Sequence, residues 1–163
     1  MDTILLQIKD IKGNSTLQDF ADAIILDSMS HGVTLPMAMD MANTERALGR
    51  AAFSEVNVSK TTDQSTPALY SACAAGTKLG DATISIGRNE SGKFLSHVKY
   101  TLGNAMISSI STGLGGGGTD SISIVYSKIT MEYTQQGVTG DKAGTASFGW
   151  DLAKNAPAAA AKK

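Results

Sequence analysis

The chain has little of what a disulfide-stapled, membrane-spanning or nucleic-acid-binding protein needs. Its 163 residues include one cysteine, Cys73, so no disulfide can form within the chain. It has no run of the roughly 18 apolar residues that a membrane-spanning helix requires. Charged residues make up 18% of the chain and nearly balance, giving a formal net charge of −1 without the basic excess typical of nucleic-acid binding. We therefore expect no membrane insertion and no nucleic-acid partner.

Residues that commonly carry catalysis or metals are also scarce. The two histidines, His31 and His97, lie far apart, and neither C-x-x-C nor H-x-x-x-H occurs. Neither G-x-S-x-G nor G-x-x-x-x-G-K-[ST] is present. Residues 113–118 satisfy G-x-G-x-x-G, but a strand pattern follows instead of the helix that a dinucleotide site requires. We predict a hairpin loop there, and expect a protein that is not an enzyme and has no cofactor.

What the chain does contain is short segments of alternating polar and apolar residues. Seventeen glycines and many Ser, Thr, Val and Ile residues are typical of an all-β fold with frequent turns. Strands are predicted at 3–9, 23–30, 53–60, 81–87, 93–102, 106–112, 120–135 and 144–152. Within 120–135, the alternation of inward-facing apolar residues shifts by one residue, as happens at a bulge or at a barrel corner. The pattern predicts a mainly β protein, a closed or nearly closed β-barrel of two packed antiparallel sheets.

Two segments depart from the strand pattern. Ser65, Thr66 and Pro67 form a helix start, with a hydroxyl cap and a proline at the first helical position, and Gly76 is a plausible stop. One short helix is therefore expected at about 66–75. The segment of about 33–51 shows neither a helical nor a strand periodicity. Its methionines at alternate positions, Met37, Met39 and Met41, predict a long extended loop with one apolar edge. An ordinary strand with core contacts is the alternative for this segment.

The helix start belongs to a longer motif, V-x-V-x-K-x-x-D-x-S-T-P-x-L, formed by Val56, Val58, Lys60, Asp63, Ser65, Thr66, Pro67 and Leu69. It resembles the hemolysin-coregulated protein (Hcp) family, which forms the inner tube of the bacterial type VI secretion system. Three further pieces resemble the same family: the turn at 10–15, the strand ending in S-T-G at 113, and G-W-D at 149–151. Together they cover nearly the whole chain. Met29 departs from the family pattern, in which an aromatic residue commonly precedes the serine found here as Ser30.

The length of the chain predicts a single Hcp-like domain over 1–153, and the Ala-rich C-terminal residues predict a flexible tail over 154–163. The resemblance implies homohexameric rings that stack into a tube, and a lumen that carries or chaperones secreted effector proteins. The contractile sheath and the spike proteins of the secretion system are further implied partners. The chain would be made in the cytoplasm and exported without a cleaved signal peptide.

The resemblance also nominates residues. Ser30 is the candidate for contact with effectors in the lumen, with a solvent-facing strand serine as the alternative. Ring stacking is assigned to Leu35, Met37, Met39 and Met41. The family-motif or subunit-interface candidates are Lys60, Asp63, Ser65, Thr66, Pro67 and Leu69. Two other functions remain open, a free-standing β-sandwich binding module (for carbohydrate, for example) and a phage tail tube-like protein. The first usually displays a platform of aromatics, whereas aromatic residues are only 6% of this chain.

Overall fold

The structure, a computed structural model, describes residues 2–39, 46–136 and 142–158. Most of the chain lies in two antiparallel sheets. The seven-stranded sheet has the order β15-β14-β13-β10-β9-β1-β2. Its strands are β1 (Thr3–Ile8), β2 (Ile24–Leu26), β9 (Ala82–Glu90), β10 (Lys93–Gly103), β13 (Lys128–Gln136), β14 (Lys142–Asp151) and β15 (Ala156–Pro157).

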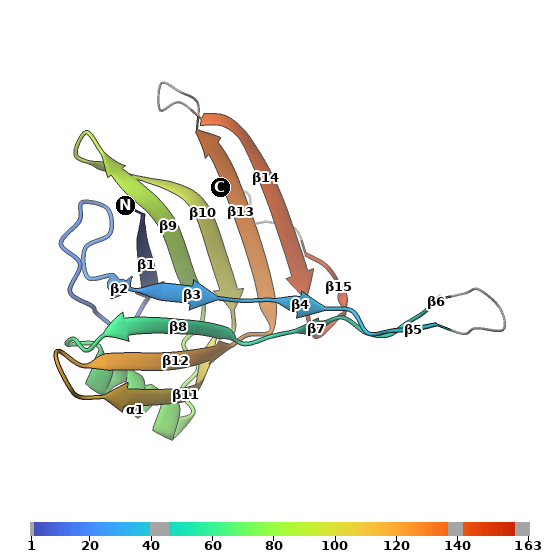
Figure 1. Ribbon diagram of the computed structural model, residues 1–163, viewed down its shortest axis with the longest axis horizontal. Coiled ribbons are helices and arrows are strands. Elements are labelled where there is room, and N and C mark those ends of the chain that lie inside the picture. Colours follow the sequence, from blue (N-terminus) through green and yellow to red (C-terminus); the bar gives the residue numbers. More distant parts are fainter. Residues whose placement is uncertain (1, 40–45, 137–141, 159–163) are drawn as a thin grey trace.

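The second sheet has four strands in the order β11-β12-β8-β3. Its strands are β3 (Ser28–Ser30), β8 (Val56–Thr61), β11 (Met106–Gly113) and β12 (Thr119–Val125). Figure 1 shows this sheet running across the foot of the seven-stranded sheet. Residues of both sheets pack into one apolar core, including Leu6, Val56, Ile84, Leu102 and Ile122. The fold is thus the predicted mainly β architecture, two packed antiparallel sheets that form a nearly closed barrel.

The chain changes sheet at two places where we predicted single strands. The segment 23–30 divides at Asp27 into β2 and β3, and the Asp27 N–H donates to the Ser59 carbonyl at 2.7 Å. The segment 120–135 divides at 126–127 into β12 and β13. Both predictions of one continuous strand were wrong. The phase slip that suggested a barrel corner in the second segment marks this crossing between sheets.

The predicted helix is confirmed as α1 (Thr66–Ala75), which lies beside β11. It buries Leu69 and Ala72, and Gly76 ends it in the left-handed conformation with φ 61°. The start differs from prediction, because the Ser65 side chain makes no capping bond and donates to Asp63 instead. Pro67 occupies the second helical position, since Ser65 is the N-cap residue. Among the residues that the structure describes, no helix is long and apolar enough to cross a membrane.

The predicted extended loop forms a two-stranded arm. β4 (Val33–Thr34) pairs with β7 (Ala52–Phe53), and β5 (Met37–Met39) pairs with β6 (Arg46–Leu48). Residues 33–39 and 46–53, called the arm below, project away from the two main sheets (Figure 1). Phe53, predicted as the start of the strand at 53–60, ends β7 instead, and β8 begins only at Val56. Beyond β14, β15 pairs with Trp150 and Asp151.

Candidate functional site

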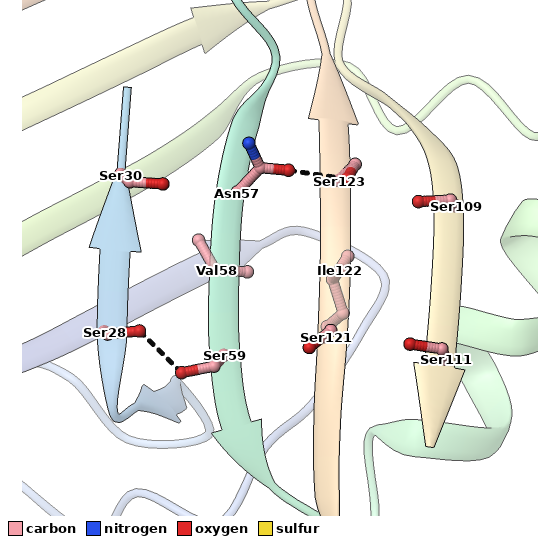
Figure 2. Close-up of a pocket in the computed structure, with 10 residues that line it drawn as sticks. All are labelled: Ser28, Ser30, Asn57, Val58, Ser59, Ser109, Ser111, Ser121, Ile122 and Ser123. Carbon is pink, nitrogen blue, oxygen red and sulfur yellow. Dashed lines mark hydrogen bonds between the residues drawn. The ribbon is translucent and has the colours of Figure 1, made fainter. Parts of the chain in front are cut away.

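The outer face of the four-stranded sheet carries an ordered set of small polar side chains. Alternation along β8 and β12 turns Val58 and Ile122 into the core and their neighbours outward. Strand register then aligns the outward residues into two rows of four across β3, β8, β12 and β11. The rows are Ser28, Ser59, Ser121, Ser111 and Ser30, Asn57, Ser123, Ser109. We call these eight residues the serine face (Figure 2).

The serine face offers hydrogen bonds without charge. Seven of its members are hydroxyls and one is an amide, and they line a shallow hollow of about 310 Å³. Ser28 and Ser59 share a hydrogen bond of 2.6 Å, and the Ser123 hydroxyl donates to Asn57 Oδ1 at 2.7 Å. A hydroxyl both donates and accepts, so this face can bond either kind of polar group, directly or through water. Its chemistry suits polar contact with a partner and offers no nucleophile–base pair.

Ser30, the predicted effector-contact residue, lies on this face in β3, at the edge of the four-stranded sheet. The structure places it beside Asn57 and in one row with Ser123 and Ser109. Its contact with effectors stays a prediction. The other members of the face were missed as candidates. The signal for them was the serine or asparagine at alternate positions of three separate strands, and only the register shows that they align.

The family-motif residues gather around a buried lysine. The Lys60 side chain is fully buried, and its Nζ lies 2.9 Å from Asp63 Oδ1 and 2.9 Å from Asp120 Oδ2. It also donates to Thr66 Oγ1 at 3.0 Å. Asp120 accepts from three hydroxyls, those of Thr66 at 2.6 Å, Thr112 at 2.7 Å and Thr62 at 3.0 Å. This lysine network therefore joins β8, the start of α1, the start of β12 and the end of β11.

Hydrogen bonds keep both carboxylates of the lysine network ionised. Burial alone would raise the pKa of Asp120, but bonds from Thr66, Lys60 and Thr112, with Thr62, outweigh it and lower the pKa to about 2. Burial likewise opposes ionisation of Asp63, and bonds from Lys60 and Ser65 outweigh it, so its pKa is lowered. The ion pairs thus persist at neutral pH.

Burial decides how the motif residues can act. Lys60, Ser65 and Leu69 are fully buried within the chain, Thr66 is nearly so, and Pro67 is exposed. Their part in a subunit interface stays a prediction, and for the buried ones it is indirect, through the placement of α1 on the sheet. Asp120 was missed, although Lys60 shares the inward phase of Val56 and Val58 and a buried lysine needs a carboxylate. Register pairs Asp120 directly with Lys60, and that pairing is not visible in the sequence.

The arm exposes apolar side chains. Val33 is 53% exposed, Leu35 41% and Met37 56%. Of the other predicted stacking residues, Met41 and the side chain of Met39 lie outside the described residues. Within the described part of the chain, no three His, Cys, Asp or Glu side chains gather where they could hold a metal ion.

Comparison with known proteins identifies the family to which the chain belongs. The family model described as "Type VI secretion system effector, Hcp" matches residues 5–133. The chain belongs to the Hcp family of type VI secretion. The protein Hcp1 of Pseudomonas aeruginosa is 28% identical over 108 residues, which cover 64% of this chain and 67% of that protein.

Solved structures of Hcp-related proteins share the fold. A structure of a type six secretion system protein superposes with a TM-score of 0.88 at 21% identity, covering 97% of this chain and all of that chain. Hcp1 from Salmonella typhimurium gives a TM-score of 0.78 at 19% identity, with coverage of 96% and 99%. The two sheets and the helix are therefore the Hcp fold, and the resemblance found in the sequence is confirmed at the level of the family.

Proposed function

We propose that this chain is a structural subunit of the type VI secretion tube and not an enzyme. Six copies close into a ring, rings stack into a hollow tube, and the tube is expelled with effector proteins in its lumen. The contractile sheath and the spike proteins are its other partners, and the subunit leaves the cell with the tube. The observation that carries this proposal is the serine face, a continuous uncharged surface on one side of an Hcp-family fold.

The serine face is suited to line the lumen. A wall that holds and then releases different proteins must avoid large apolar patches and strong charge, because both give persistent contacts. The serine face has neither, since its two rows contain only hydroxyls and an amide. Ser30 lies at the β3 edge of this wall, where we propose that it contacts effectors.

The arm is suited to join one ring to the next. An isolated two-stranded hairpin is marginally stable in water, so a projecting arm gains order when another surface covers it. Val33, Leu35 and Met37 provide an apolar surface for that contact. We propose that Leu35 and Met37, with Met39 and Met41, pack on a second copy of this chain in the adjacent ring. Head-to-tail contacts of this kind continue as a tube, whereas those within the ring close.

The test is the solution mass of the full chain by light scattering, with negative-stain images of the same peak. We expect a mass of six subunits and annular particles, and stacked rings at high concentration. Met37→Ser is expected to keep the rings and shorten the stacks, because it removes apolar contact area from the arm. Met37→Leu is the matched control and keeps stacking. A monomer at every concentration would contradict the proposal and favour the free-standing binding module.

A further inference from the structure

The two strands of the arm meet the body of the protein at one point. The Gly32 N–H donates to Ser54 Oγ at 2.8 Å, and the Ser54 N–H donates to the Gly32 carbonyl at 2.9 Å. Gly32 directly precedes β4 and Ser54 directly follows β7, so these bonds bind the incoming and outgoing strands together. This pair is the root of the arm.

One tyrosine holds both sides of that root. The Tyr126 hydroxyl donates to the Ser54 carbonyl at 2.8 Å and lies 2.5 Å from His31 Nε2. A carbonyl only accepts, so the hydroxyl proton is directed to Ser54, and the bond to His31 must have Nε2–H as its donor. Tyr126 itself lies at 126–127, where the chain crosses between the two sheets. A single side chain thus ties both arm strands to the crossing point of the barrel.

Aromatic packing also anchors the outgoing strand of the arm to β14. Phe53 stacks on Trp150 with ring centroids 6.1 Å apart and on Phe148 at 6.4 Å, both from β14. Arg50 also donates to the Leu152 carbonyl, just beyond β14. These contacts anchor the outgoing strand to the seven-stranded sheet. The incoming strand is held through His31, whose ring lies 5.8 Å from that of Tyr126 and stacks on Phe53 at 6.3 Å.

We propose that Tyr126 is a positioning residue that clamps the root of the arm and sets the direction in which it leaves the body. The inference rests on the proposed function, since the direction of the arm would decide how one ring meets the next. The clamp works without charge at neutral pH. Burial raises the pKa of Tyr126 to about 12 and lowers the pKa of His31, so both side chains stay neutral.

Tyr126→Phe tests the clamp, because it keeps the ring and removes only the hydroxyl. Amide hydrogen exchange is followed by mass spectrometry on the full chain, at a concentration where light scattering shows no stacks. Peptides covering 31–38 and 49–54 are expected to exchange about tenfold faster than in the wild type, as loss of two hydrogen bonds predicts. Tyr100→Phe is the matched control and is expected to leave the arm unchanged. The Tyr100 ring also lies near His31, at 6.4 Å, but its hydroxyl has no bond to a described residue.

A second pair of variants keeps the proposal testable if Tyr126→Phe fails to fold. His31→Gln retains a donor toward Tyr126 and is expected to keep slow exchange, whereas His31→Ala is expected to lose it. Unchanged arm exchange in Tyr126→Phe, or equal exchange in the two His31 variants, would overturn the clamp. Faster exchange with normal stack length in negative stain would leave the clamp standing and contradict the stacking role of the arm.

Discussion

A fully buried lysine organises one end of the four-stranded sheet. One ammonium group faces two carboxylates, so the lysine network carries one excess negative charge. Hydroxyl donors from Thr62, Thr66 and Thr112 offset that excess at Asp120. The partners come from β11, β12, α1 and the turn between β8 and α1, so the network forms only when these elements are assembled correctly. Loss of the charge-assisted hydrogen bonds in this buried network is more costly than loss of a surface ion pair.

Asp120→Asn is expected to lower the free energy of unfolding at pH 7 by about 3 kcal/mol, because Lys60 and three threonine hydroxyls lose charge-assisted hydrogen bonds to a buried carboxylate, although the Lys60–Asp63 pair remains. The variant should also change the response to acid. The folded pKa of Asp120, about 2, lies below its unfolded value, so its contribution is present above about pH 4 and disappears as the pH falls toward 2. When urea unfolding is measured from pH 7 to pH 2, the free energy of unfolding should decrease less in the variant than in the wild type.

Asp22→Asn is the control for this experiment. Asp22 pairs with Lys12 on the surface, with side chains 57% and 75% exposed, so its replacement should cost at most about 1 kcal/mol. An Asp120→Asn variant as stable as this control would contradict the lysine network as a stabilising element. At this scale the sequence revealed Lys60, Asp63 and Thr66 through the family motif. It did not reveal Asp120, because the pairing depends on strand register across 60 residues of chain.

Secondary structure was most predictable where its cause is local. α1 spans the predicted residues, although Ser65 does not cap it, and its end at Gly76 has a local cause because glycine readily adopts the left-handed conformation. The strands of the β9–β10 hairpin follow from alternation for the same reason. The breaks at Asp27 and Tyr126 were not predicted, because the apolar residues before Asp27 give no sign of a crossing, and the phase slip within 120–135 fits a bulge as well as a change of sheet. Which sheet a strand joins is decided by its partners.

The β9–β10 pair depends on one glycine. A Cβ on Gly87 would lie 2.1 Å from the Leu95 carbonyl oxygen, beside the register shift between Ser96 and Val98. Gly87→Ala is therefore expected to lower the free energy of unfolding by about 3 kcal/mol, because the backbone of a central strand must move. Gly144→Ala in β14 is the control, since its Cβ would meet nothing within 4 Å. Equal denaturation midpoints for the two variants would contradict this account.

The molecule as a whole separates its two proposed contact surfaces. The serine face covers the four-stranded sheet, and the arm projects beyond β3 and β8 (Figure 1). The family motifs predicted an extended segment and Ser30 from the sequence. They could not predict the face around Ser30, which forms only when four strands distant in the chain come into register. The hexamer and the tube remain proposals that a single chain supports through the placement of these surfaces.

Ser30→Asp is expected to leave the six-subunit ring intact and to reduce effector retention about tenfold, because it places charge on a surface that bonds by neutral groups. Effector abundance in cells measures retention, and light scattering of the purified chain measures the ring. Ser30→Thr keeps the hydroxyl and is expected to behave as the wild type. Unchanged effector stability in cells carrying Ser30→Asp would count against a lumen contact at this position.

The two rows of the serine face have a consequence for how freely this surface can change over time. Neighbouring strands lie about 4.8 Å apart, and outward positions repeat about every 6.8 Å along each strand, so each polar group is one of several near-equivalent groups. Loss of any one leaves seven in place, and substitution among small neutral residues preserves the collective property. The serine face therefore tolerates neutral substitutions at single positions, and no single one of its residues has to be conserved. A substitution that introduces a charge, in contrast, changes the property of the whole surface.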